Sequence, residues 1–246
     1  MQKSNPLDNI SIVLVDTKTP ANIGAAARCM MNLGLRHLIL VDPPKDERGE
    51  AQKLAAGAYE LIEKAAVFPT LTGALADHGL VLGTSRHKGR RRKNVNTPRE
   101  AAEMVMPMLA DNRVAVVFGN EVNGLENSEL ALCHEIITIP SSDAFPSLNL
   151  SHAVMIVAYE LYLASGEGVG QGGRLLARLE ETEGLYLQLQ ETLQTIGFLE
   201  RDHPERMMFS FRQLFGRAGL TSRDVSIVRG VLSTVDRVVS DGKKDS

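Results

Sequence analysis

The feature that most constrains the fold is a repeated change of hydrophobic period along the first two thirds of the chain. Short apolar runs rich in β-branched residues alternate with stretches whose apolar residues recur every three or four positions. The predicted strands are 10–15, 38–41, 80–83, 114–118 and 136–139, and the predicted helices are 23–34, about 51–65, 71–76, one from Pro98, 128–132 and 150–163. This alternation predicts an α/β fold, with a parallel sheet covered by helices on both faces.

The composition changes at Ser165, which marks a predicted domain boundary. Residues 165–173 contain five glycines and predict a flexible linker. Beyond them the spacing is typical of helix packing, with a predicted seam of Leu179, Thr182, Tyr186, Leu189, Leu193 and Ile196. We therefore predict an α/β domain at 1–164, a linker at 165–173 and a small helical domain at 174–246.

Charge, cysteine content and hydropathy exclude several classes of protein. The formal net charge is −3, so any nucleic-acid contact must come from a local basic patch. Cys29 and Cys133 lack metal-ligand spacing, and two cysteines in apolar surroundings are typical of a reducing compartment. No run approaches the roughly 18 apolar residues of a membrane helix, and the first residues lack an apolar signal core. We expect a cytoplasmic protein without a metal or a membrane partner.

Ligands of open parallel sheets bind beyond the carboxyl ends of the strands, so the loops there are the candidate positions for functional residues. The first loop leads into a helix through Asn22, Gly24 and Arg28. Asn22 can cap this helix, and Gly24 followed by three alanines allows another group to approach closely. Arg28 lies at the border of the predicted buried face, where an ordinary solvated arginine is the favoured interpretation of this segment alone.

The second loop is strongly basic. Six of the eight residues from Arg86 to Lys93 are lysine or arginine. A solvated loop is one interpretation, but in an acidic protein we favour contacts to the phosphate backbone of a nucleic acid, since no aromatic residue is interleaved for base stacking. The candidate nucleic-acid-binding residues of this loop are Lys88, Arg90, Arg91, Arg92 and Lys93.

The third and fourth loops combine glycine, carboxylate and amide residues. Gly119 to Leu125 follows the most apolar strand and places Glu121 between two glycines, which also fits a simple surface turn. The fourth loop, 139–149, leads into the last helix of the α/β domain, and its Ser147 or Asn149 can simply cap that helix. Considered alone, each of these two loops allows both a structural and a functional interpretation.

Taken in order, three of the loops resemble a known motif set. They are Asn22-x-Gly24-x-x-x-Arg28, Phe118-Gly119-x-Glu121-x-x-Gly124-Leu125 and Ser147-Leu148-Asn149-Leu150. This set resembles the SPOUT class of methyltransferases, and within it the TrmH family of RNA ribose 2'-O-methyltransferases, over about residues 9–164. Residues 211–218 and 227–232 resemble the helical extension of the TrmJ branch, which methylates the first nucleotide of the tRNA anticodon loop.

The resemblance implies a fold and a set of site residues. The sheet would end in a deep trefoil knot, an exception to the rule against threaded chains, and the protein would be a homodimer with S-adenosylmethionine as methyl donor. Arg28 matches the catalytic arginine, and Asn22, Glu121, Ser147 and Asn149 match its supporting polar residues. The positions that match the donor site are Thr84, Ser85, Arg86, Gly119, Ile139, Pro146, Ser147 and Leu148. At Pro146 a serine is common in the TrmJ branch, so a side-chain contact is in doubt there.

Ribose methylation needs a group that deals with the proton of the 2'-hydroxyl. Arginine is an unfavourable base, because its guanidinium holds its proton far above neutral pH. Arg28 is therefore expected to stabilise the developing alkoxide, or to pass the proton on with the help of an RNA phosphate. Glu121 has two open roles, as the base or as the residue that orients Arg28 or the ribose.

The helical segment 206–232 contains five arginines and one acid, and its Arg212 and Arg217 are candidate tRNA contacts. Ribosomal RNA is an alternative substrate. A dinucleotide-dependent oxidoreductase is disfavoured because no Gly-x-Gly-x-x-Gly follows the first strand. A non-catalytic RNA-binding dimer is disfavoured by the intact motif set.

Overall fold

A computed structural model describes residues 5–44, 51, 55, 57–86, 95–166, 175–199 and 204–242. The chain divides into two compact units, Met1–Arg174 and Leu175–Ser246. The predicted linker starts at Ser165, the last residue of a helix, while its residues 167–173 lie outside the described residues.

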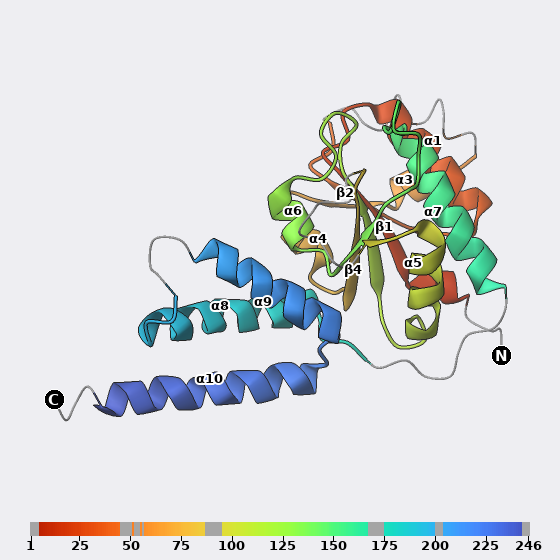
Figure 1. Ribbon diagram of the computed structural model, residues 1–246. Coiled ribbons are helices and arrows are strands. Elements are labelled where there is room, and N and C mark those ends of the chain that lie inside the picture. Colours follow the sequence, from red (N-terminus) through yellow and green to blue (C-terminus); the bar gives the residue numbers. More distant parts are fainter. Residues whose placement is uncertain are drawn as a thin grey trace. The chain divides into compact units, whose positions relative to one another are not determined.

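The described part of the first unit contains one seven-stranded sheet in the order β3-β2-β1-β6-β4-β7-β5 (Figure 1). Every pairing between neighbouring strands in it is parallel. The strands are β1 (Ile10–Val15), β2 (His37–Val41), β3 (Ala66–Phe68), β4 (Leu80–Thr84), β5 (Val95–Asn96), β6 (Val114–Phe118) and β7 (Glu135–Ile137). This sheet confirms the predicted fold class, whereas the knot stays a prediction.

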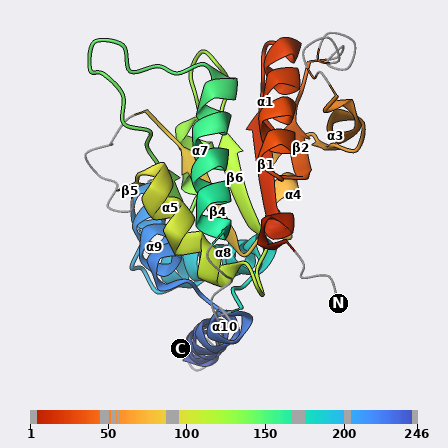
Figure 2. The same ribbon diagram turned by 90° about the vertical axis from the view of Figure 1, so that its right-hand side faces the viewer.

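Helices cover both faces of the sheet, which explains why its central strands are apolar throughout. The helices of this unit are α1 (Pro20–Asn32), α3 (Tyr59–Glu63), α4 (Leu71–Leu75), α5 (Pro98–Val105), α6 (Asn127–Ala131) and α7 (Leu150–Ser165). α7 packs against α1 and α5 on one face, while α4 and α6 lie on the other (Figures 1 and 2). All residues of β1 and β6 are buried between these layers.

Local sequence explains where several helices start. Thr97 accepts the N–H of Glu100, and the Glu100 carboxylate accepts the N–H of Thr97, which forms a capping box before Pro98. Asn149 caps α7 by accepting the N–H of Ser151. Asn149 was one of the two caps expected for α7 and is confirmed, whereas Asn22, expected to cap α1, lies inside that helix, which begins at Pro20.

Some predicted elements were wrong or missing. The helix expected over about 51–65 is interrupted at Gly57, whose φ of 94° is not helical, and α3 covers only Tyr59–Glu63. The strands β3 and β5 were not predicted. The strand expected at 136–139 runs from Glu135 to Ile137.

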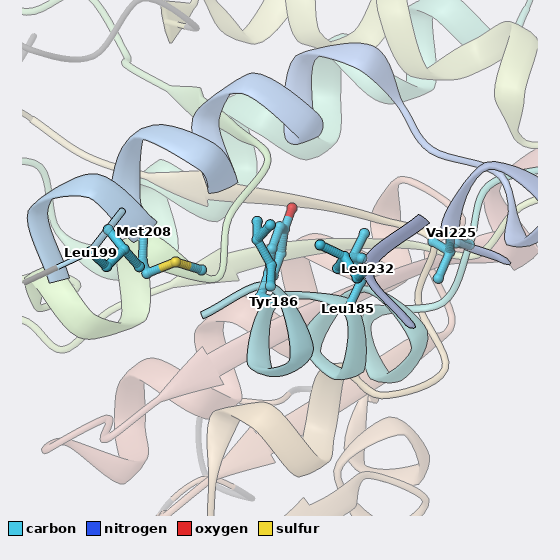
Figure 3. Close-up of a cluster of buried hydrophobic side chains, with 8 residues drawn as sticks. Leu185, Tyr186, Leu199, Met208, Val225 and Leu232 are labelled. Carbon is cyan, nitrogen blue, oxygen red and sulfur yellow. The ribbon is translucent and has the colours of Figure 1, made fainter. Parts of the chain in front are cut away.

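The second unit is helical, as expected, and has its own core. Its helices are α8 (Leu179–Thr195), α9 (Glu205–Ala218) and α10 (Ser222–Gly242). The core contains Tyr186, Leu185 and Leu232, with Met208 and Leu199 at one end and Val225 at the other (Figure 3). Ile196 was wrongly assigned to the packing seam and is exposed, because α8 ends at Thr195 and the chain turns.

Candidate active site

Loops that follow four adjacent strands start at one edge of the sheet. β1, β6, β4 and β7 are successive neighbours in the sheet and run in the same direction. Their carboxyl ends, Val15, Phe118, Thr84 and Ile137, therefore lie at the same edge. This is the edge at which ligands of open parallel sheets bind.

Glu121, three residues beyond β6, is the centre of a hydrogen-bond network at this edge. Its Oε2 accepts the backbone N–H of Lys18 at 2.9 Å, and its Oε1 accepts the backbone N–H of Thr19 at 3.1 Å and Nδ2 of Asn22 at 2.7 Å. The turn after β6 is thereby tied to the loop after β1 and to the first turn of α1. Three donors facing one carboxyl group favour its ionised form, because a carboxylate only accepts hydrogen bonds and accepts them more strongly than the neutral acid.

The same contacts determine the pKa of Glu121. Partial burial by itself raises this pKa, but the hydrogen bonds from Asn22 and from the N–H groups of Lys18 and Thr19 outweigh burial and hold the pKa below its usual value. An ionised carboxylate with a lowered pKa is a weak base near neutral pH. The sequence left two roles open for Glu121, as a base or as an orienting residue. The geometry supports the orienting role.

The network continues from Glu121 into the fourth loop. The Oδ1 of Asn22 accepts Nδ2 of Asn149 at 3.1 Å, and the Oδ1 of Asn149 accepts the N–H of Ser151 at 2.9 Å and its hydroxyl at 2.7 Å. A carboxylate at one end and a backbone N–H at the other fix the direction of each amide along this chain. Asn22, Glu121 and Asn149, from three separate loops, are thus brought together as expected from the motif set.

Two of the expected site residues are not part of this network. Arg28 lies further along α1 and is exposed, and among the described residues its guanidinium makes no hydrogen bond or ion pair. Ser147 is exposed in the loop before α7. Within one chain, Glu121 therefore orients Asn22 and the loop after β1, and does not bind Arg28.

The residues expected at the donor site lie in the loops after β4, β6 and β7, which are adjacent strands. The hydroxyl of Thr84 donates to the carbonyl of Val117 at 3.0 Å, and the N–H of Ser85 donates to the carbonyl of Ile137 at 2.9 Å. These bonds join β4 to β6 and to the end of β7. The positions expected at the donor site are Thr84, the last residue of β4, and the loop residues Ser85, Arg86, Gly119, Ile139, Pro146, Ser147 and Leu148.

Gly24 and Gly119 are needed for close approaches within the protein itself. A Cβ on Gly24 would come within 2.2 Å of the Ala51 carbonyl oxygen, so the group that approaches α1 is the protein's own backbone. A Cβ on Gly119 would come within 2.1 Å of the carbonyl carbon of Gly124, across the turn that carries Glu121. Both glycines are thus required by the packing of the loops themselves.

The loops around this edge fit a ligand that has polar and apolar faces. The hydroxyl of Thr138, directly after β7, is buried and lacks a hydrogen-bond partner in the part of the chain that the structure describes. Phe145 and Leu148, in the following loop, are apolar side chains that are exposed. A buried hydroxyl after β7 and exposed apolar side chains in the loop that follows are features that suit a nucleoside ligand such as S-adenosylmethionine.

The expected RNA contacts are only partly described. Lys88, Arg90, Arg91, Arg92 and Lys93 lie outside the described residues. In the helical unit, Arg212 forms an ion pair with Glu183, with one N–O distance of 2.7 Å, and lies over the ring of Tyr186. Arg217 is exposed and is therefore better placed than Arg212 to contact RNA.

The structure adds three residues that the sequence search did not single out. Asp16 follows β1, Asn120 follows Gly119, and Nδ2 of Asn120 donates to Oδ2 of Asp16 at 3.0 Å. Lys18 Nζ contacts the other oxygen of Asp16 at 2.5 Å. Their positions just beyond apolar strands could have marked these residues as candidates for the site. No local spacing, however, links Asp16 to Asn120, which lies 104 positions later.

The described residues show neither a metal-binding cluster nor a membrane-spanning helix. Among the described residues, no group of three or more histidine, cysteine or acidic side chains is arranged to hold a metal ion. Within the same ranges, no helix has both the length and the hydropathy needed to cross a membrane.

Comparison with known protein families identifies both units. Residues 9–159 match the model of the SpoU rRNA Methylase family, and residues 180–244 match the model of the tRNA methyltransferase TrmJ, C-terminal domain. A tRNA (cytidine/uridine/adenosine-2'-O-)-methyltransferase TrmJ of Pseudomonas aeruginosa is 38% identical over 245 residues, covering 94% of this chain and 95% of the relative. The tRNA (cytidine/uridine-2'-O-)-methyltransferase TrmJ of Escherichia coli K12 is 37% identical, with coverages of 94% and 96%.

Solved structures give the same result. TrmJ from Z. mobilis ZM4 superimposes with a TM-score of 0.78 at 34% identity, covering 92% of this chain and 98% of that one. A probable methylase family protein from Haemophilus influenzae gives a TM-score of 0.62 at 33% identity, with coverages of 95% and 98%. These likenesses extend over both units of the chain.

Proposed function

This chain belongs to the SpoU methylase family and carries a TrmJ C-terminal domain, and from that premise we propose that it methylates a ribose 2'-hydroxyl of tRNA. The target is the first nucleotide of the anticodon loop, the methyl donor is S-adenosylmethionine, and the enzyme is cytoplasmic. The activity named for the P. aeruginosa and E. coli relatives supports the tRNA substrate.

One observation carries this proposal at the level of residues. The Glu121 carboxylate, the Asn22 amide and the Asn149 amide form one hydrogen-bonded chain across three loops at the carboxyl edge of the sheet. Each of these residues belongs to a different motif of the set. Their convergence is what a shared active site requires and what unrelated surface turns would not produce.

S-adenosylmethionine supplies a methyl group activated by a positively charged sulfur. The loops after β4, β6 and β7 would hold this donor, with Thr84 and Gly119 at their starts and Ile139 and Leu148 in the last loop. Thr138 offers a buried hydroxyl without a partner among the described residues. The apolar side chains in the last loop exclude water from the bound nucleoside.

Arg28 is the proposed catalytic residue. Its guanidinium carries only N–H donors, and it can donate to the ribose 2'-oxygen as that oxygen loses its proton. Glu121 is a positioning residue, because its oxygens already accept three hydrogen bonds. The proton then leaves to solvent or to an RNA phosphate near Arg28.

A homodimer would give Arg28 a site in which to act. The outer side of α7 exposes Met155, Tyr159, Tyr162 and Leu163, each between 38% and 50%, and α7 packs beside α1, which carries Arg28. Exposed apolar side chains that recur along one helix are typical of a subunit interface. We infer that a second copy covers this side and receives Arg28 into its own site.

RNA contacts come from both units in this proposal. The basic loop 87–94 would contact the backbone near the active site, and Arg217 would contact it from the helical unit. Contacts of this kind make binding strongly dependent on salt.

The proposal is tested by incubating purified protein with S-adenosylmethionine and an unmodified tRNA transcript, followed by nuclease digestion and mass spectrometry of the nucleosides. We expect one 2'-O-methyl group, at the first anticodon nucleotide. The matched control is the same tRNA with a 2'-deoxyribose at that nucleotide, which removes the acceptor oxygen. Methylation of ribosomal RNA fragments but not of tRNA would replace the proposed substrate, and methylation of neither would overturn the proposal.

A mixing experiment tests the shared site. Arg28→Ala and Leu148→Asp proteins are each expected to be nearly inactive, the second because a charge in the donor loop opposes binding of S-adenosylmethionine, but subunits that exchange would form mixed dimers with one intact site. Random mixing should restore roughly a quarter of wild-type activity, since half of the dimers are mixed and each has one working site. If the mixture stays inactive although mixed dimers are detected by native mass spectrometry, Arg28 acts within its own chain.

A further inference from the structure

Asp16 and Asn120 form a second connection between the loops that carry the active-site network. Asp16 directly follows β1, and Asn120 is the second residue after β6, whose last residue Phe118 pairs with Leu14 of β1. Nδ2 of Asn120 donates to Oδ2 of Asp16 at 3.0 Å. Neither residue belongs to the motif set, and neither takes part in the proposed chemistry.

The Asn120 side chain also shapes the turn on which Glu121 lies. Its Oδ1 accepts the N–H of Val122 at 3.1 Å and the N–H of Asn123 at 2.8 Å. Two N–H groups require the amide oxygen, and the carboxylate of Asp16 requires the amide nitrogen, so the orientation of this amide is fixed. A single side chain thus closes the turn and ties it to the loop after β1.

Asp16 is held in an unfavourable backbone conformation. Its φ is 49°, in the left-handed region that non-glycine residues rarely occupy. Such a conformation persists where the surroundings impose it, and here the N–H of Asp16 donates to the carbonyl of Val41 at 2.9 Å while its side chain accepts from Asn120. The direction in which the chain leaves β1 toward Lys18 and Thr19 is therefore set partly by this pair.

We propose that Asn120 and Asp16 are positioning residues for methyl transfer, holding the turn of Glu121 in register with the loop that leads to Asn22 and Arg28. This inference rests on the proposed function. The two loops are joined at two places, by Asn120 with Asp16 and by Glu121 with the N–H groups of Lys18 and Thr19. Loss of one connection leaves the Glu121 turn free to shift relative to α1.

Other charges near Asp16 are weaker determinants of this geometry. Lys18 pairs with Asp16, but the two side chains are 55% and 36% exposed, and ion pairs at the surface contribute little. Glu121 and Asp42 face Lys18, and Glu129 on α6 is close enough for its pKa to be affected by Asp16. Asn120, by contrast, is a neutral donor whose position is fixed by two further hydrogen bonds.

An exchange of the two side chains tests the proposal. Asn120→Asp keeps the acceptor for the N–H groups of Val122 and Asn123 but places a second carboxylate against Asp16. We expect its kcat for tRNA methylation to fall about tenfold to a hundredfold with little change in KM for tRNA. The double variant D16N/N120D reverses the donor and the acceptor, and asparagine tolerates the left-handed conformation, so it should recover most of the lost kcat.

The pH profile separates positioning from a merely structural role. In Asn120→Asp, one of two facing carboxyl groups takes up a proton at lower pH and becomes a donor again, so its activity relative to wild type should rise as the pH falls. The double variant should follow the wild-type profile. Asn123→Asp adds the same charge to the same turn without facing Asp16, and should keep wild-type activity and profile.

Three results would overturn the inference: unchanged kcat in Asn120→Asp, a double variant no better than the single one, or equal loss in Asn123→Asp. Thermal unfolding is measured for every variant, and if Asn120→Asp does not fold, the double variant must restore both folding and activity. An inactive wild-type protein, by contrast, would refute the proposed function itself.

Discussion

Replacing Glu121 by glutamine is the sharpest single test of how the site is held together. The exchange keeps the size of the side chain but replaces one oxygen by an NH₂ group. Three donors face the two oxygens in the structure, one on Oε2 and two on Oε1. The best orientation of glutamine keeps its oxygen on the N–H of Thr19 and Nδ2 of Asn22, which leaves its NH₂ group against the N–H of Lys18.

The size of the effect follows from this count. One hydrogen bond to a charged acceptor is lost and a contact between two donors replaces it. Hydrogen bonds to charged groups contribute about 1.5–3 kcal/mol, and Glu121 is partly exposed, so we expect the lower end of that range. A loss of about 1.5 kcal/mol in the free energy of unfolding corresponds to a fall of about 3–6 °C in Tm. The same loss in the transition state lowers kcat about tenfold.

The assay is the pH dependence of tRNA methylation, measured alongside thermal unfolding by circular dichroism. Because hydrogen bonds lower the pKa of Glu121 in spite of its partial burial, the carboxylate is ionised over the whole neutral range. Its contribution to stability is present above the unfolded pKa and is lost as the pH falls through the lower folded pKa. Glu121→Gln should therefore reduce the rate by the same factor at every pH between about 6 and 9.

A change in the shape of the profile would refute this reasoning. If Glu121→Gln removes an ionisation seen in the wild-type rate near neutral pH, Glu121 acts as the base. If Tm and kcat both remain unchanged, the three hydrogen bonds do not hold the loops.

Three other perturbations have expected outcomes. A Cβ on Gly83 would lie 2.5 Å from Sγ of Cys133, so Gly83→Ala should lower the free energy of unfolding by about 1–3 kcal/mol. Adding Cys133→Ala to that variant should recover part of the lost stability, and a double-mutant cycle in urea would measure this coupling. Burial lowers the pKa of His78 to about 4, so Tm should decrease as the pH falls from about 6.5 toward 4, and less so in His78→Gln. Arg212→Ala should destabilise the helical unit more than Arg217→Ala, because Arg212 pairs with the partly buried Glu183, as urea unfolding would show.

The central part of the fold was predictable because its signal is local. The strands at the middle of the sheet are covered on both faces, so nearly every residue in them is apolar and the runs are easily recognised. β3 and β5 lie at the two edges of the sheet. The first two residues of β3, Ala66 and Val67, are exposed, and β5 has only two residues. Edge strands this short leave no hydrophobic pattern to detect.

The site was predictable to the extent that its residues follow strands. Asn22, Glu121 and Asn149 each lie just beyond a strand or at the start of a helix, and their motifs have a recognisable order. Asp16 and Asn120 also lie just beyond strands. Their proposed positioning role depends on the hydrogen bond between them, which no spacing in the sequence indicates. The correct reason for Gly24 was also out of reach, because the carbonyl that approaches it belongs to Ala51, 27 residues later.

The hydrogen-bond network limits which group can take part in the chemistry. Both oxygens of Glu121 accept protein donors, and both ends of the amides of Asn22 and Asn149 are engaged. A network whose members are already paired can hold loops in place, but each member would have to break a bond to accept a proton from the ribose. Of the five residues expected to be catalytic or supporting, Arg28, Ser147 and Asn149 are exposed, and of these three only Asn149 is engaged in the network among the described residues. Since a guanidinium donates and does not accept, the positive charge of Arg28 can stabilise the 2'-oxygen while the proton leaves to a group outside the network.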